Sequence, residues 1–503
     1  MRFQNLPPTA DKLTHLPATR CSAPRSARVI ADDPTLVTPL AYHWGMSTHG
    51  LLQAREKMAA AGVDKAAIDV FEHYYHQLEA GETGLIPEAT IDPLLDPPRL
   101  EDVQVSDEQA RDAIRQTVII KLNGGLGTSM GMSKAKSLLP VRDGKSFVDL
   151  LVDQVRATRR RYDARLPLLF MNSFNTRDDT LAALARHDDL AVDDLPLDFL
   201  QSQEPKLLAD DLDPVSWPAD PRLEWCPPGH GDLYPSLLST GILAQLVEAG
   251  FRYACVSNSD NLGAGPDATL AGWFASTGAP YAAEVCRRTA MDRKGGHLAV
   301  RKSDGQLILR DTAQCPPEEM HYFTDEHRHP YFHCNNLWFD LPAVLRVLTE
   351  RGGVLGLPLI RNAKTVDPSD ADSPAVVQIE SAMGAAIEVF TGAQAIWVPR
   401  RRFLPVKTTN ELLLLRSDAY DVAPDGSLTL TVDEAPVIEL SKAYKKIDDF
   451  ERRFPSGPPS LREARGLRVD GDWTFGADVQ VVGDATLDEA GGTVDDGARL
   501  GAS

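Results

Sequence analysis

Two nearly continuous apolar runs constrain the fold of this 503-residue chain more than any other feature. The first run is TVIIKL at residues 117–122. The second is FRYACVS at residues 251–257, part of a candidate strand at residues 251–258. A strand without polar alternation is buried on both faces, which is typical of the parallel sheets of layered α/β domains. Further candidate strands, with helical stretches between them, lie at residues 166–172, 281–285, 332–339 and 395–399. We therefore expect an α/β domain with a mostly parallel sheet over residues 116–405.

The segments on either side of this domain have a different character. Residues 1–45 are rich in Pro, Thr and Arg and lack periodicity, so we expect a disordered tail. Residues 46–115 are expected to form a helical N-terminal region, from apolar spacings of three and four over 47–81, and a Pro-rich acidic linker at 87–107. The C-terminal part, residues 406–503, ends in short apolar pairs punctuated by Gly and Asp. That pattern fits the rungs of a small β-helix or ordinary hairpins.

Composition excludes several classes of function. The formal net charge of −20 argues against a nucleic-acid partner, which needs a basic footprint. No stretch approaches 18 uncharged apolar residues, so a membrane span is not expected. The six cysteines are scattered without CxxC spacing, which favours a reducing, cytoplasmic setting over a disulfide or zinc framework. In such an acidic chain, any phosphate-binding site must supply its own local cations.

The most informative segment is KLNGGLGTSMGMSKAKS at residues 121–137, directly after a predicted buried strand. Glycines at this density let backbone N–H groups approach an anion closely. A Walker A loop does not fit, because no register places the second Gly before a Lys. A dinucleotide fingerprint fails too, since Met130 stands where the third Gly belongs. A plain glycine-rich turn would not explain why Lys134, Lys136 and Ser137 close the same segment.

A second polar segment, SNSDNLGA at residues 257–264, follows the strand at 251–258. Open α/β sheets place their ligand crevice at the carboxyl ends of strands. Asp260 is therefore a candidate Mg²⁺ ligand, because that ion takes one or two carboxylates plus substrate phosphates. The alternative is an Asx-turn that only ends the strand. In isolation, Lys364 and Lys407 would be read as solvated surface lysines.

Seven motifs occur together in one order: KLNGGLGTSMG…KAKS, PPGHGD, SNSDNLGA, KGGHL, NNLW, AMGAAIEVF and RFLPVKTT. In this order the chain resembles the eukaryotic-type UDP-glucose pyrophosphorylase family, from about residue 47 to about residue 420. The resemblance implies a Rossmann-like mixed sheet of the nucleotide-sugar transferase kind. The β-helix-like C-terminal domain is expected from the Gly and Asp spacing of residues 406–503, which the resemblance covers poorly. It also implies Mg²⁺ as cofactor, and UTP and glucose 1-phosphate as small-molecule partners. Self-association through the C-terminal domain stays open.

Roles of individual residues follow from the same resemblance. Lys136 and Lys407 are expected to be catalytic, and Asp260 to bind the metal. The expected UTP-binding residues are Leu122, Asn123, Gly124, Gly125, Lys136, Gln201, Gly229 and Asp260. The expected sugar-phosphate residues are His230, Asn258, Asn335, Asn336, Glu380 and Lys407. His333 stands where the family usually has Asn, which bears on the choice between glucose and galactose.

The implied reaction needs no general base, because a phosphate monoester is largely dianionic at pH 7 and is itself the nucleophile. This agrees with motifs that are rich in Gly, Lys and Asn and contain no Ser-His-Asp constellation. Two other functions remain open at this point. One is a broader UDP-sugar pyrophosphorylase that also uses galactose 1-phosphate. The other is an inactive nucleotide-sugar sensor, against which the presence of Lys136, Asp260 and Lys407 argues.

Overall fold

The computed structural model describes residues 40–289, 292 and 295–501, so most of the predicted tail at residues 1–45 lies outside the described residues. The predicted helical region consists of two helices, α1 (Leu40–Ala60) and α2 (Lys65–Glu79). The break comes at Asp64, whose carboxylate accepts the Ala66 N–H and caps α2. None of the helices in the described residues is long and apolar enough to cross a membrane.

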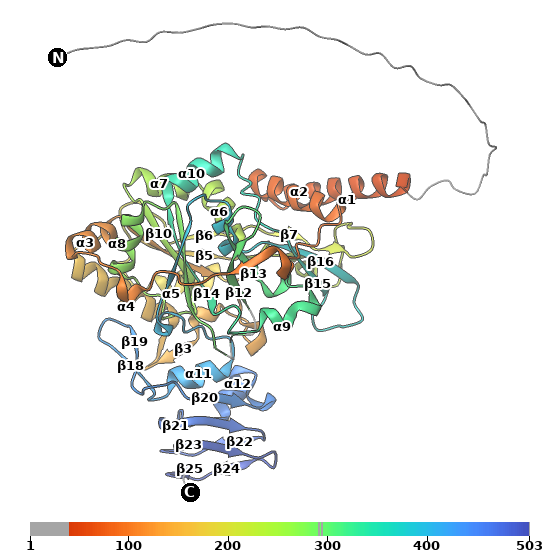
Figure 1. Ribbon diagram of the computed structural model, residues 1–503. Coiled ribbons are helices and arrows are strands. Elements are labelled where there is room, and N and C mark those ends of the chain that lie inside the picture. Colours follow the sequence, from red (N-terminus) through yellow and green to blue (C-terminus); the bar gives the residue numbers. More distant parts are fainter. Residues whose placement is uncertain (1–39, 290–291, 293–294, 502–503) are drawn as a thin grey trace, which may run out of the picture. The chain divides into compact units, whose positions relative to one another are not determined.

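A ten-stranded mixed sheet forms the centre of residues 46–503 (Figure 1). Its main path runs β1-β12-β14-β10-β2-β5-β6, with β13 beside β12, β11 beside β14, and β17 beside β11. All six predicted strands are present. They are β2 (Thr117–Asn123), β5 (Leu168–Asn172), β10 (Tyr253–Asn258), β11 (Tyr281–Arg287), β14 (Tyr331–Asp340) and β17 (Gln394–Trp397). The strands that the sequence pattern missed are β1 (Ile91–Pro93), β6 (Asp198–Leu200), β12 (Gly296–Arg301) and β13 (Leu307–Asp311).

The direction of the strands corrects the expectation of a mostly parallel sheet. Strands β10, β2, β5 and β6 are parallel neighbours, and so are β11 and β17. However, β14 runs antiparallel to both β10 and β11, and β12 pairs antiparallel with β1, β13 and β14. The resemblance implied this mixed sheet, whereas apolar content alone did not. Burial on both faces makes a strand apolar whichever way its neighbour runs.

Helices cover both faces of the sheet, which explains the continuous apolar runs. Along β2, Ile119 packs into one core, whereas its neighbours Val118 and Ile120 pack into the other. The first core is shared with α3 (Asp107–Arg115), α4 (Phe147–Tyr162) and α8 (Ala268–Thr277). The second is shared with α6 (Leu233–Ser239), α7 (Ile242–Glu248) and α10 (Leu341–Glu350). The result is a three-layer α/β domain (Figure 1).

The stretch at residues 87–107 is packed against the domain rather than extended as a linker. Strand β1 lies within it and pairs with β12, and Ile91 is buried. Glu88 is also buried, and its carboxylate accepts hydrogen bonds from Arg310 (2.6 Å) and Arg328 (2.5 Å). Composition suggested a linker because this stretch is rich in Pro and acidic residues, but its partners lie more than 200 positions away.

A smaller sheet supports the N-terminal helices. Its strands, in spatial order, are β15 (Ile360–Thr365), β16 (Ala375–Glu380) and β8 (Leu207–Leu208), all antiparallel. Val377 and Ile379 of β16 pack with Phe71 and Tyr75 of α2 in one apolar cluster. Short ladders join β7 (Glu204–Pro205) to β9 (Trp225–Cys226) and β3 (Pro140–Arg142) to β4 (Lys145–Ser146). Two further short helices are α5 (Arg177–Leu184), which contacts β6 of the large sheet, and α9 (Met320–Phe323).

Beyond α11 (Thr409–Arg416) and the β18–β19 ladder (Tyr420–Val422, Leu428–Leu430), the C-terminal strands stack in parallel, at the foot of the view in Figure 1. One ladder joins β20 (Val437–Leu440), β21 (Ser460–Val469), β23 (Gln480–Leu487) and β25 (Arg499–Leu500). A second joins β22 (Trp473–Phe475) to β24 (Gly492–Val494). Parallel neighbours cannot be hairpins, so these strands have the rung-on-rung pairing of a β-helix. Helix α12 (Ile447–Arg453) lies between β20 and β21 in the sequence.

Candidate active site

The predicted nucleotide segments meet at the carboxyl ends of two neighbouring strands. Strands β2 and β10 are parallel and in register, with Leu122 opposite Asn258. The glycine segment that leaves β2 and the SNSDNLGA loop that leaves β10 therefore begin side by side. The Ser259 N–H donates to the Leu122 carbonyl at 3.0 Å and fastens the two segments together. This is the crevice position expected of an open α/β sheet.

Gln201 packs directly on the glycine segment. A Cβ added to Gly124 would lie 2.8 Å from Gln201 Oε1, so a larger residue at Gly124 would displace the amide. Further along, Gly127 and Gly131 have φ values of +64° and +73°, a left-handed conformation that favours glycine. The Lys136 N–H donates to the Gly125 carbonyl at 3.2 Å and closes the loop. The structure thus brings Gln201, Gly124, Gly125 and Lys136 together.

The two groups expected to bind phosphate and metal contact each other. Lys136 Nζ donates to Asp260 Oδ2 at 2.6 Å, and also to the Val406 carbonyl. The Val406 N–H in turn donates to the Asp260 carbonyl at 3.4 Å. Lys407, the next residue, is exposed and lies with its Nζ 5.9 Å from the Phe332 ring centroid. Three motifs that are far apart in sequence therefore converge on one ion pair.

The donor set bears on whether Mg²⁺ fits here. Among the described residues, no group of three or more His, Cys, Asp or Glu side chains could hold a metal ion by itself. Asp260 is a single carboxylate, about 18% exposed, beside a lysine. Such a site does not form a protein cage, but it fits a Mg²⁺ ion whose remaining ligands are water and substrate phosphates.

Asn258 and Asn335 face each other next to this ion pair. Asn335 Nδ2 donates to Asn258 Oδ1 at 3.0 Å. Asn335 has a φ of +57°, and its N–H donates to His333 Nδ1 at 3.2 Å. Burial lowers the pKa of His333 to about 3, so the ring is neutral and Nδ1 can accept this bond. His333 therefore supports the turn that presents Asn335.

Two predicted site residues point their side chains into the protein instead. Asn123 Nδ2 donates to Asn172 Oδ1 (2.8 Å) and to Thr180 Oγ1 (2.9 Å). Asn336 is fully buried, and its Nδ2 donates to Glu284 Oε2 at 3.0 Å and to the Arg402 carbonyl at 3.2 Å. These amides hold the site loops in place. At Asn123 and Asn336, only the backbone groups therefore remain available to a ligand. Leu122 is half-buried at the end of β2.

Gly229, His230 and Glu380 form a second group around the backbone of residues 380–383. Gly229 has a φ of +76°, and an added Cβ would lie 2.6 Å from the Ser381 carbonyl oxygen. His230 Nδ1 accepts the Met383 N–H at 2.9 Å, which leaves Nε2 as the donor of a neutral ring. Burial raises the pKa of Glu380, with a hydrogen bond from Asn362 opposing the shift. These three predicted residues are brought together.

Sequence reasoning assigned no role to Lys121, although this side chain organises the Asp260 loop. Lys121 is about 1% exposed, and its Nζ donates to Ser257 Oγ at 2.7 Å and to the Ala264 carbonyl at 2.8 Å. It thereby ties the two ends of the loop at 257–264 together. Burial lowers its pKa to about 8. The sequence signal for this role was a lysine inside an otherwise apolar strand, because a buried charge is costly unless it is paired or hydrogen-bonded.

Sequence reasoning also missed a buried ion pair between Arg402 and Glu284. Arg402 donates to Glu284 through Nε (2.8 Å) and Nη2 (2.9 Å), and Glu284 Oε1 accepts the Trp338 indole N–H at 2.9 Å. Burial disfavours the charged carboxylate, but Arg402 and these hydrogen bonds outweigh burial, so the pKa of Glu284 is lowered. A glutamate in the buried strand at 281–285 was the signal that could have revealed it.

Comparison with known proteins agrees with this geometry. The family model described as UTP–glucose-1-phosphate uridylyltransferase matches residues 68–482. The chain is 39% identical over 379 residues to a probable UTP–glucose-1-phosphate uridylyltransferase of Schizosaccharomyces pombe, covering 74% of this chain and 73% of that protein. It is 37% identical over 410 residues to the UTP–glucose-1-phosphate uridylyltransferase of Solanum tuberosum, covering 80% and 83%.

Solved structures give the same result. The UDP-glucose phosphorylase of Trypanosoma brucei superposes with a TM-score of 0.84 at 41% identity, covering 90% of this chain and 98% of that one. The UDP-glucose pyrophosphorylase of Leishmania major also superposes with a TM-score of 0.84, at 42% identity and the same coverage. Sequence family, fold and site geometry agree, and the chain belongs to the UTP–glucose-1-phosphate uridylyltransferase family.

Proposed function

We propose that this protein converts UTP and α-D-glucose 1-phosphate into UDP-glucose and pyrophosphate. The observation that carries the proposal is the convergence of Lys136, Asp260 and the 406–407 segment beside the glycine loop. Members of the family to which the chain belongs carry this activity in their names. A site that only sensed a nucleotide sugar would not require these three groups together.

In the proposed reaction, a phosphate oxygen of glucose 1-phosphate attacks the α-phosphorus of UTP. A new P–O bond forms to the sugar phosphate, and the bond from the α-phosphorus to the bridging oxygen of pyrophosphate breaks. The nucleophile is already largely dianionic, so the protein need not remove a proton. Its task is to hold two anions in line, and such positioning is worth roughly 7–11 kcal/mol.

The cations at the site would offset the repulsion between the substrates. Lys136 sits at the closure of the glycine loop and Lys407 beside it, where each can meet phosphate oxygens. Asp260, with phosphates and water, would hold Mg²⁺. When bound, that ion supplies charge neutralisation at the phosphates and the departing pyrophosphate. Because Lys136 occupies Asp260 Oδ2, its ammonium must share or yield this carboxylate.

The remaining residues would orient the substrates. Gln201 on Gly124 offers an amide donor and acceptor to the base, which matches the N3–H and carbonyl of uracil. Asn258, Asn335, His230 and Glu380 would surround the sugar phosphate. We also include a cytoplasmic location in the proposal, because the described cysteines are all free thiols. Self-association through the C-terminal strands stays a prediction.

A pyrophosphate-release assay with UTP and glucose 1-phosphate tests the proposal. We expect turnover with glucose 1-phosphate to exceed that with galactose 1-phosphate. Lys407→Ala should lower kcat by about 10²–10³ with a smaller effect on the KM for UTP, because the contact strengthens as the two anions converge. Lys65→Ala, at an exposed lysine of α2, is the control and should behave as the wild type. Absence of pyrophosphate release by the wild type would overturn the proposal.

A further inference from the structure

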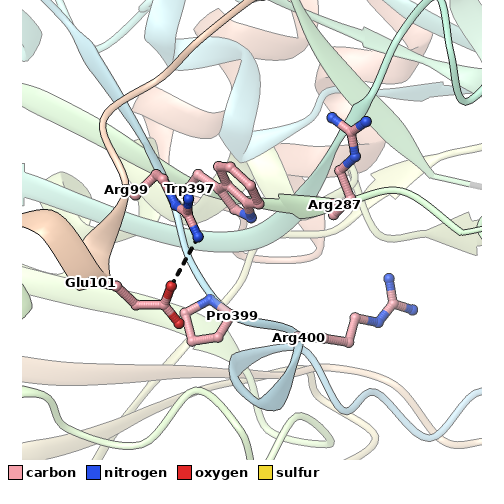
Figure 2. Close-up of a pocket in the computed structure, with 6 residues that line it drawn as sticks. All are labelled: Arg99, Glu101, Arg287, Trp397, Pro399 and Arg400. Carbon is pink, nitrogen blue, oxygen red and sulfur yellow. Dashed lines mark hydrogen bonds and ion pairs between the residues drawn. The ribbon is translucent and has the colours of Figure 1, made fainter. Parts of the chain in front are cut away.

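A second cavity lies away from the residues described above. It encloses about 230 Å³ at the ends of β11 and β17, and it is lined by Arg99, Glu101, Arg287, Trp397, Pro399 and Arg400. Figure 2 shows Arg99 beside the Trp397 indole, with Glu101 below, and Arg287 and Arg400 on the other side of the pocket. None of these six side chains belongs to the candidate active site.

The charges of this cavity are unusual for so acidic a protein. Three guanidinium groups face one lining carboxylate, in a chain with a net charge of −20. Arg99 donates to Glu101 at 3.1 Å, and Arg400 donates to Asp292 at 2.6 and 2.9 Å. Arg287 is exposed and lies 5.7 Å from the Tyr331 ring centroid. In the part of the chain that the structure describes, its guanidinium has no hydrogen-bond or ion-pair partner. Its donors are therefore available to an anion.

The shape and the wall of the cavity narrow the class of ligand. An arginine fork binds phosphate or carboxylate oxygens in pairs. Trp397 and Pro399 add a flat apolar wall, while Glu101 can accept hydrogen bonds from hydroxyl groups. A volume of 230 Å³ is about eight times the ~30 Å³ share of one water molecule, which is more than a lone inorganic anion fills. These features match a small phosphorylated organic molecule of sugar-phosphate size.

We propose that this cavity is a second binding site, distinct from the active site, for a small phosphorylated organic anion held by Arg287 and Arg400. Arg400 begins a short helical turn, Arg400–Arg402, that continues towards the active site. At the other end of this turn, the Arg402 carbonyl accepts hydrogen bonds from Asn261 (3.1 Å) and Asn336 (3.2 Å). A ligand bound in this cavity therefore affects the position of the turn at Arg400–Arg402, which leads to Lys407. The effect of that movement on catalysis rests on the proposed function.

Isothermal titration calorimetry tests the site without reference to activity. The titrants are glucose 6-phosphate, inorganic phosphate and glucose, each added to the full chain in excess UDP-glucose. We expect glucose 6-phosphate to bind, inorganic phosphate to bind more weakly, and glucose not to bind. Arg287→Ala should weaken glucose 6-phosphate binding by about tenfold to a hundredfold, as expected for a lost charge-assisted hydrogen bond. Arg287→Lys, which keeps the charge but not the fork, should recover only part of the affinity.

Arg401→Ala is the matched control, because Arg401 is an exposed arginine of the same turn that does not line this cavity. It should bind glucose 6-phosphate as the wild type does. Arg287 is exposed at the end of β11, so its replacement should leave the melting temperature unchanged. The proposal is wrong if the wild type does not bind glucose 6-phosphate, or if Arg287→Ala binds it with unchanged affinity. An inactive protein that still shows Arg287-dependent binding would overturn the proposed function but not this site.

Discussion

The ion pair between Lys136 and Asp260 shows how single residues depend on one another at this site. Each was expected to contact substrate or metal, yet each is the other's partner at 2.6 Å, and both side chains are less than one fifth exposed. Asp260 therefore has two tasks, to hold Lys136 in place and to offer a carboxylate to the metal. Replacing Asp260 by Asn removes the charge but keeps the shape of the side chain, so the substitution tests the electrostatic contribution of Asp260 alone.

We predict that Asp260→Asn will require more Mg²⁺ for half-maximal activity and will lose about 10²–10³ in kcat, the usual cost of one well-placed electrostatic group. Titrating Mg²⁺ at saturating UTP and glucose 1-phosphate measures both effects. Asp433→Asn, at an exposed aspartate outside the site, is the control. An Asp260→Asn protein with an unchanged Mg²⁺ titration and near-normal turnover would assign Asp260 to a structural turn.

At the scale of elements, the loop at 257–264 is held by one buried ammonium group. Lys121 reaches from β2 to both ends of the loop, at Ser257 and Ala264. We predict that Lys121→Met, which keeps the length but removes the donors, will lower kcat by roughly tenfold to a hundredfold, because small displacements of reacting groups are costly. Hydrogen exchange of the loop amides should become faster in the same variant.

Lys206 provides a matched control for this element. It is also a buried lysine, about 4% exposed, and its Nζ donates to the Val366 carbonyl at 2.8 Å; neither Lys206 nor Val366 is a predicted site residue. Each substitution leaves a carbonyl without its donor, a cost of about 1–3 kcal/mol in stability. Lys206→Met should nevertheless keep its kcat. Equal losses of kcat in the two variants would mean that stability, not the loop, explains the effect.

At the scale of the whole molecule, one buried carboxylate should make stability depend on pH. Asp232 is about 3% exposed and accepts hydrogen bonds from the Ser202 N–H (2.6 Å) and from Ser236 Oγ (2.8 Å). Burial raises the pKa of Asp232 from 3.8 to about 6, and the hydrogen bonds oppose this shift. Between these two values, the folded protein binds more protons than the unfolded chain. The contribution of Asp232 to stability therefore falls as pH rises through this window.

Asp232→Asn removes the titration while an amide oxygen can still accept both hydrogen bonds. We predict that the stability of the variant relative to the wild type will rise by up to about 3 kcal/mol between pH 4 and pH 7, because each pKa unit corresponds to 1.36 kcal/mol. Urea denaturation at a series of pH values measures this difference. A difference that stays constant over the whole range would show that Asp232 has an ordinary pKa in the folded protein.

Much of the architecture and of the site was predictable because local patterns record burial. The apolar runs at 117–122 and 251–257 became central strands, and the polar segments after them met at the carboxyl edge of the sheet. Gly229 was named from the resemblance, and its backbone conformation and close packing leave no room for a side chain. The family itself was identifiable from the order of seven motifs, and the comparisons confirm it.

Other features were decided only when distant segments met. An apolar strand records that it is covered, not the direction of its neighbour, so the antiparallel β14 was not visible in its residues. Likewise, an asparagine in a site motif has the same chemistry whether its amide faces a ligand or, as in Asn336, bonds to Glu284. The sequence by itself determined that the apolar strands are covered on both faces, that certain turns need glycine, and which chemistry is present. The tertiary structure alone decided which side chains face one another, because hydrogen bonds and ion pairs such as Lys136–Asp260 join residues that no local pattern connects.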